Sequence, residues 1–131
     1  NSPLHVGKAA FYQSEEICLF AGYLIRLNYS KDEVDGRFLN YYLNAPSTRA
    51  HGYGVMTSSV NQANINGTKL KAYPFFKVPL EVQQTVREKL EQLEELLNQS
   101  KQSLETMLNE YAQLKSAILG QEFQPPQSDA A

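Results

Sequence analysis

Residues 86–118 read VREKLEQLEELLNQSKQSLETMLNEYAQLKSAI, and this stretch decides the fold of the 131-residue chain. Ten positions in it, spaced alternately four and three residues apart, form what we call the heptad seam: Val86, Leu90, Leu93, Leu97, Ser100, Leu104, Met107, Tyr111, Leu114 and Ile118. Such spacing puts a narrow apolar stripe on one side of a helix, and this stripe leaves water only against a partner helix. The seam therefore predicts a coiled coil formed by two chains. It does not choose between parallel and antiparallel pairing.

The seam lies within a longer segment that is free of glycine and proline. This segment, Leu80–Leu119, predicts a helix of about 60 Å at 1.5 Å per residue. Pro79 suits the start of a helix, and Glu81 lies near the positive end of the helix dipole. We expect Gly120 to end the helix and residues 121–131 to form a flexible tail.

The residues before this helix predict a small mixed structure. Lys8–Tyr12 and Ile17–Asn28 are rich in strand-forming residues and are predicted to form a hairpin. Asp35 is placed to cap a helix over Gly36–Asn44. A last extended piece is expected at Lys69–Val78. The predicted fold class is therefore α+β, with strands and a short helix followed by one long coiled-coil helix. The strand-like start suggests a fragment of a larger domain.

Charge is divided unevenly along the chain. Residues 1–79 hold eight basic and five acidic residues, a net +3, whereas residues 80–131 hold four basic and nine acidic ones, a net −5. This division is compatible with a first part that faces a polyanion and a second part that does not.

A polar, turn-forming segment, Pro46–Gly67, is the best candidate for ligand contact. Arginine can address guanine, asparagine and glutamine can address adenine, and lysine often holds phosphates. The predicted DNA-facing residues are Arg49, His51, Thr57, Ser58, Ser59, Asn61, Gln62 and Asn64, with Lys69 and Lys71 as phosphate contacts. A solvated connection is an equally good reading of this composition.

Other classes of function find little support in the sequence. His5 and His51 are isolated, so we expect no metal site and no cofactor. Neither a nucleophile motif nor a phosphate-binding loop occurs, so we expect no enzyme activity in this chain. Cys18 lies in an apolar run and is expected to be buried. No membrane span or signal peptide is indicated, which favours a cytoplasmic location.

Several strings together resemble the specificity (S) subunit of type I restriction–modification systems. They are VGKAAFY at 6–12, YLIRL at 23–27, FLNYYLN at 38–44, Asn64-Ile65-Asn66 with Leu70, PLEVQQTV at 79–86 and LKSAIL at 114–119. Each string is degenerate alone, but their order before and along a long heptad helix is much more specific. The family usually has an acidic residue where Val82 stands.

The resemblance implies a division of the chain into three parts. Residues 1–79 would be the C-terminal part of a target recognition domain that reads double-stranded DNA, residues 80–120 a spacer helix, and residues 121–131 a tail. In this family two spacer helices pack antiparallel, set the distance between half-sites and dock the modification subunits. Methylation and cleavage belong to the partner modification and restriction subunits. For this chain, we therefore expect an antiparallel homodimer through the helix.

A second hypothesis assigns the helix a role in oligomerisation and assigns the chain no DNA binding. In it, the chain is a structural oligomerisation protein whose globular part is only a cap. Loss of DNA affinity with rising salt would favour the first hypothesis, because bound phosphates release counterions.

Overall fold

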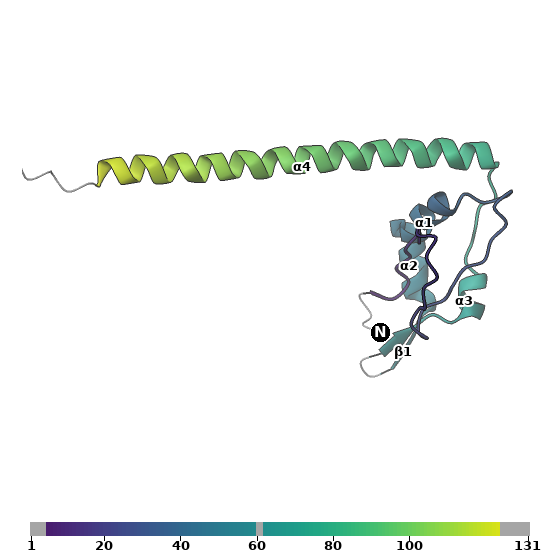
Figure 1. Cartoon of the computed structure of the whole chain (residues 1–131). Helices are drawn as coiled ribbons and strands as arrows, with labels where there is room; N and C mark the ends of the chain where they lie inside the picture. The colour runs from purple at the N-terminus through teal and green to yellow at the C-terminus, as the bar shows by residue number, and fades with distance from the viewer. Residues whose placement is uncertain (1–4, 60–61, 124–131) are drawn as a thin grey trace, which may run out of the picture. The chain divides into compact units, whose positions relative to one another are not determined.

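A computed structural model describes residues 5–59 and 62–123 of the chain. The predicted tail lies mostly at 124–131, outside the described residues. The chain divides into two compact units, Asn1–Lys89 and Leu90–Ala131. The first unit contains five short elements, helices α1 to α3 and strands β1 and β2, and also the first turns of the long helix α4 (Figure 1).

Helix α1, Gly36–Asn44, confirms the predicted short helix and its cap. The Asp35 carboxylate accepts hydrogen bonds from the backbone N–H groups of Arg37 at 2.9 Å and Phe38 at 2.8 Å. These bonds satisfy two amides that have no partner within the helix. The C-terminal end of α1 holds the N-terminal segment, because the Asn44 side-chain amide exchanges two hydrogen bonds with the backbone of Ala9, at 3.1 and 2.9 Å.

The predicted strands at Lys8–Tyr12 and Ile17–Asn28 are wrong for the described structure. Both segments are irregular, and the one sheet among the described residues is the β1–β2 pair elsewhere in the chain. A strand needs a neighbouring strand for its backbone hydrogen bonds, and the residues themselves supply only propensity. Ile17 and Leu19 are fully exposed.

The segment Pro46–Gly67, predicted from its composition to be turn-forming, is largely helix and strand instead. Helix α2, Pro46–Val55, begins with the proline at its first position, where a missing N–H costs nothing. Strands β1, Thr57–Ser59, and β2, Gln62–Asn64, follow as an antiparallel pair with Thr57 opposite Asn64. Two glycines inside α2 obscured the helix in the sequence.

The last piece before the long helix is helical rather than extended at its start. Helix α3, Gly67–Lys71, is capped by the Asn66 side chain, which accepts from the Lys69 N–H at 2.9 Å. The predicted extended segment therefore applies only after α3. The small apolar core lies among these elements; its buried members are Val6, Ala63 and Ile65, with Met56, Leu70 and Tyr73 packed against them.

Helix α4, Leu80–Glu122, confirms the long helix, which continues two residues past the predicted end at Gly120. Glycine is costly inside a helix, but near its end it only weakens the last turn. The large apolar side chains of the heptad seam from Leu93 to Ile118 are each at least half exposed. From Leu93 to Ile118 the seam thus has no apolar cover within its own unit.

Two further observations concern exposure. Cys18, expected to be buried, is exposed because its segment has no sheet to join. Among the described residues, no helix combines the length and the apolar character that crossing a membrane requires.

Candidate nucleic-acid interface

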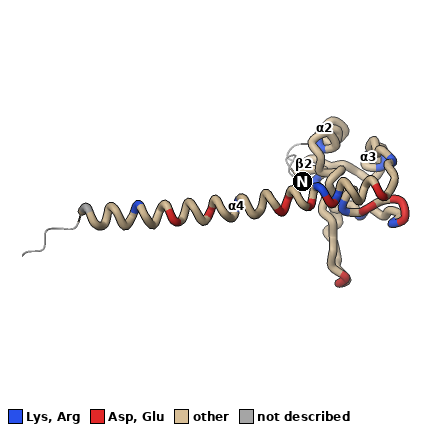
Figure 2. Tube along the Cα trace, turned by 90° about the horizontal axis from the view of Figure 1, so that it is seen from above, with Lys and Arg blue, Asp and Glu red and all other residues tan. Residues whose placement is uncertain are grey.

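The predicted DNA-facing residues are close in sequence and belong to one part of the fold, which we call the hairpin module, residues 46–73. It consists of α2, the β1–β2 hairpin and α3 around the small apolar core. Basic positions on α2 and α3 are visible in Figure 2, where acidic residues mark α4 at intervals. The module thus carries Arg49, Lys69 and Lys71 within the net-positive part of the chain.

Arg49 is half-buried and bonded to the protein itself. One guanidinium nitrogen donates to the Val6 carbonyl at 2.5 Å, and another donates to the Tyr53 hydroxyl at 3.0 Å. The guanidinium also lies over the Tyr53 ring, 5.2 Å from its centroid. Arg49 therefore ties α2 to the N-terminal segment.

The His51 ring packs against an aromatic ring of the hairpin module. Its ring meets the Tyr73 ring edge to face, with centroids 4.9 Å apart. Gly52 allows this approach, because a Cβ there would lie 2.6 Å from the Tyr73 hydroxyl oxygen. Burial raises the pKa of the Tyr73 hydroxyl above its ordinary value, and the neighbouring Arg49 guanidinium opposes that shift. Sequence reasoning missed Tyr73, since an aromatic after a short helix carries no distinctive signal.

Lys69 joins α3 to the hairpin. Its ammonium donates to the Val55 carbonyl at 2.5 Å and to the Thr57 hydroxyl at 2.6 Å. The two contacts leave one ammonium hydrogen for another acceptor, because a lysine has three. The structure thus brings two of the predicted residues, Lys69 and Thr57, into direct contact.

The remaining predicted residues are less defined. Asn64 and Lys71 are exposed on the module surface. Ser58, Ser59 and Gln62 belong to β1 and β2, and their side chains are outside the description, as is Asn61 altogether. The predicted set therefore combines exposed polar side chains with cations that already have protein partners.

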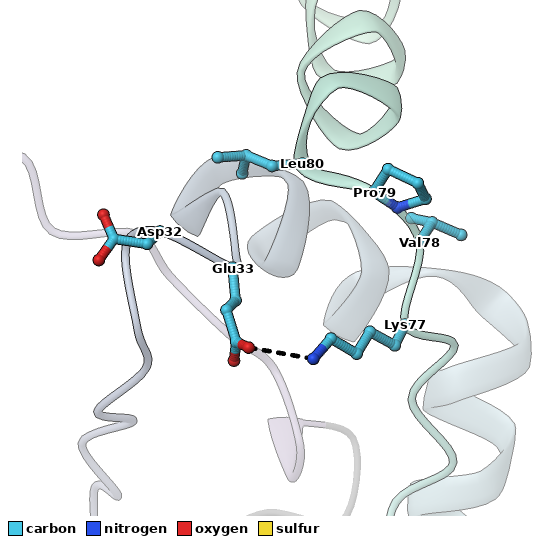
Figure 3. A pocket seen from close by; sticks show the side chains of 6 residues that line it. All are labelled: Asp32, Glu33, Lys77, Val78, Pro79 and Leu80. Carbon is cyan, nitrogen blue, oxygen red and sulfur yellow. Dashed lines mark hydrogen bonds and ion pairs between the residues drawn. The ribbon is translucent and has the colours of Figure 1, made fainter.

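A second polar cluster, which the sequence did not reveal, lies where α4 begins. Gln83 is fully buried and bonds to backbone atoms of Glu33 and Asp35, both in the segment just before α1. A hollow of about 390 Å³ beside it is lined by Asp32, Glu33, Lys77, Val78, Pro79 and Leu80 (Figure 3). Its Glu33–Lys77 ion pair, 3.0 Å long, is well exposed and contributes little to stability. The missed signal was a glutamine in the seam's own register, seven residues before Leu90.

Residues 5–59 and 62–123 contain no cluster of possible metal ligands. No group of three or more histidine, cysteine or carboxylate side chains there could hold an ion. What the geometry offers is a small module with cations and amides at its surface, followed by a helix with an uncovered apolar seam.

Comparison with known proteins defines the class. Residues 4–106 match the family described as the type I restriction modification DNA specificity domain, and the chain belongs to this family. The match includes the whole hairpin module and the first part of α4, up to Thr106.

A particular relative is the type I restriction enzyme StySPI specificity subunit of Salmonella potsdam. It is 27% identical to this chain over 104 residues, which make up 79% of the chain and 22% of that relative. The chain thus spans about a fifth of the length of the relative it matches. No solved structure matches the chain significantly.

Proposed function

We propose that the chain recognises double-stranded DNA as part of a type I specificity subunit, and that it has no catalytic role itself. The observation that carries the proposal is the family match, which runs from the start of the first unit well into α4. The net +3 charge before residue 80 supports it, because phosphate contacts supply much of the affinity of such proteins. Methylation and cleavage would then come from modification and restriction subunits bound to the chain.

The DNA would be read by the hairpin module. Exposed Asn64 and Lys71 are available for direct contact, as an amide that can address a base and an ammonium that can hold a phosphate. Arg49 and Lys69, which bond to neighbouring carbonyls, would both position the module and add charge. The other predicted DNA-facing residues, His51, Thr57, Ser58, Ser59, Asn61 and Gln62, stay part of the proposal.

The long helix would serve as spacer and as the dimer interface. Most of the stability of a helix in a protein comes from packing of its apolar face, and α4 beyond Leu93 has exposed seam residues over seven turns. Burying a leucine is worth roughly 1.5 to 3 kcal/mol, so pairing of two seams is strongly favoured. Modification subunits would dock on the paired helices.

An antiparallel homodimer can match the entire seam to itself. If the twofold axis passes the level of residue 102, Val86 faces Ile118, Leu90 faces Leu114 and Leu97 faces Met107 of the second copy, while Ser100 faces Leu104. Each pair joins an a position to a d position, as antiparallel packing requires. No seam residue is then left over at either end.

Direct DNA binding tests the main proposal. The full chain is titrated with a random-sequence duplex at increasing salt, and the logarithm of the binding constant should fall linearly with the logarithm of salt concentration. Absence of binding even at low salt would contradict DNA recognition by this chain and favour the structural oligomerisation protein.

Disulfide trapping tests the direction of the helices. In a Cys18→Ser background, a chain with Leu90→Cys is mixed with a longer, tagged chain carrying Leu114→Cys. Antiparallel pairing yields the mixed disulfide, since those positions face each other. Disulfides only between identical chains would show parallel pairing instead.

A further inference from the structure

Gln83 is the largest fully buried side chain among the described residues, with an exposed fraction of 0%. It belongs to the first unit, as do Glu33, Asp35 and Val78, to which it bonds. Burying a polar amide is unfavourable unless its hydrogen bonds are satisfied. A glutamine in this place therefore calls for an explanation in terms of what it holds.

The Gln83 amide bonds to three separate points of the backbone. Its nitrogen donates to the Val78 carbonyl at 2.8 Å and to the Glu33 carbonyl at 2.9 Å, and its oxygen accepts from the Asp35 N–H at 3.0 Å. Both donors of the amide are thus used, together with one acceptor position. The segment before α4 and the segment before α1 are joined through one side chain of α4.

Asp35 and Arg87 extend this connection by one turn of α4. The Asp35 carboxylate caps α1 with one oxygen, and its other oxygen lies 3.2 Å from Nε of Arg87. Both side chains are less than a quarter exposed, so this ion pair is less screened than a surface pair. Gln83 and Arg87 are four residues apart and therefore lie on the same side of α4.

We propose that Gln83, Asp35 and Arg87 form a polar latch that positions the spacer helix by fixing the base of α4 to the N-terminus of α1. The inference rests on the proposed function, which gives the helix its role as a spacer, and it names the residues that make the spacer rigid. An apolar side chain at residue 83 could fill the space, but its contacts would not be directional. The amide fixes both position and rotation, because its three hydrogen bonds have defined directions and join two different segments.

A small tilt at the base of α4 causes a large displacement at its far end. From Gln83 to Ile118 an α-helix extends about 52 Å, so a tilt of about 10° at the base moves the far end by roughly 9 Å. Adjacent base pairs are about 3.4 Å apart, so such a tilt corresponds to two or three base pairs. A spacer without a fixed base could not hold two DNA readers at one separation.

A distance measurement tests the latch without DNA. In the full chain with Cys18→Ser, spin labels are attached at Ala50→Cys on α2 and Asn109→Cys on the outer side of α4. A tenfold excess of unlabelled chain excludes distances between copies. We expect Gln83→Leu to broaden the distance distribution about twofold relative to the parent, because a freed base acts as a hinge. Gln84→Leu, a change at the exposed neighbour, is the matched control and should leave the width unchanged.

Each outcome decides the proposal. Equal widths for the parent, Gln83→Leu and Gln84→Leu would overturn it, and so would a parent distribution already as broad as that of Gln83→Leu. If Gln83→Leu does not fold, Arg87→Leu takes its place with the same expectation. Failure of both to fold would show that these contacts hold the unit together rather than orient the helix, which also overturns the proposal. A chain that fails to bind DNA yet shows the expected widths contradicts the proposed function alone.

Discussion

The hairpin module and the outer part of α4 are ordered in opposite ways. In α4 beyond Leu93, the backbone is regular over many turns while the large apolar side chains remain exposed. In the first unit, the elements before α4 are short, and the buried apolar core among its described residues consists of Val6, Ala63 and Ile65. The module is held mainly by single side chains that bond to backbone groups, such as Arg49 to Val6 and Lys69 to Val55.

This difference teaches where each part obtains its stability. A heptad helix repeats the same small contribution at every turn, but it receives that contribution only from a second helix. The hairpin module depends on particular contacts, each of which is lost with one residue. The two regions should therefore respond to different substitutions.

The largest effect is expected in the seam. Leu97→Ala removes one apolar side chain from each copy, so the dimer loses about 4 kcal/mol, a weakening of roughly a thousandfold. Analytical ultracentrifugation measures the dissociation constant, and far-UV circular dichroism should show helix content falling with it. The control is Leu119→Ala, which makes the same change one position outside the seam. Equal weakening by both variants would mean that the interface is not the seam.

Close packing at the start of α1 gives the next largest effect. A Cβ at Gly36 would lie 2.6 Å from the Phe11 ring and closer still to the Tyr29 hydroxyl, so both rings must move. We expect Gly36→Ala to lower the free energy of unfolding of the first unit by about 1 to 3 kcal/mol. Urea unfolding followed by the Ile65 methyl resonance measures it.

Gly54 provides the matched control for that substitution. It lies in α2, and a Cβ there meets nothing within 4 Å. Gly54→Ala should leave stability unchanged or raise it by up to about 1 kcal/mol, because alanine favours the helix. A loss of stability at both positions would contradict the role given to the two rings.

Prediction from sequence succeeded where the pattern is periodic and local. The Asp35 cap and both of the expected helices follow from spacing and from one capping residue, whereas pairing through the seam stays a prediction. Prediction failed where a partner strand was assumed for Ile17–Asn28, and where glycines hid α2. Propensity describes what a segment prefers, whereas a strand exists only with the backbone beside it.

For the candidate site the sequence predicts a location, which stays a prediction, but not how that segment folds. Polar composition placed it within residues 46–71, and the structure arranges that segment as one module. The partners of Lys69 and Arg49 could not be predicted, since they are carbonyl groups brought near by the fold. Gln83 looked like an ordinary polar residue of a helix, although its register position within the seam was a usable signal.

A smaller effect separates the two lysines of α3. Lys71→Ala should reduce the slope of log binding constant against log salt by about 1 and leave stability unchanged. Lys69→Ala should reduce that slope and also lower the free energy of unfolding by about 1 kcal/mol, because it removes hydrogen bonds to Val55 and Thr57. Lys101→Ala on α4 is the control. If it reduced the slope as much as Lys71→Ala, the hairpin module would not be the contact surface.

The smallest effect concerns the buried hydroxyl of Tyr73. Burial raises the pKa of Tyr73 in the folded chain, so above the ordinary tyrosine pKa of about 10 the unfolded chain loses this proton first. The unfolded state then binds fewer protons than the folded one, and stability falls as pH rises from there. Tyr73→Phe should remove part of this fall in the free energy of unfolding between about pH 9 and 11. Urea unfolding at each pH measures that free energy, and similar slopes of the curves make the values comparable. Tyr23→Phe, at a largely exposed tyrosine, should retain the fall seen in the parent chain.

An identical pH dependence in the parent and Tyr73→Phe would show that water reaches the Tyr73 hydroxyl. The hairpin module would then be more open around Gly52 than its packing indicates.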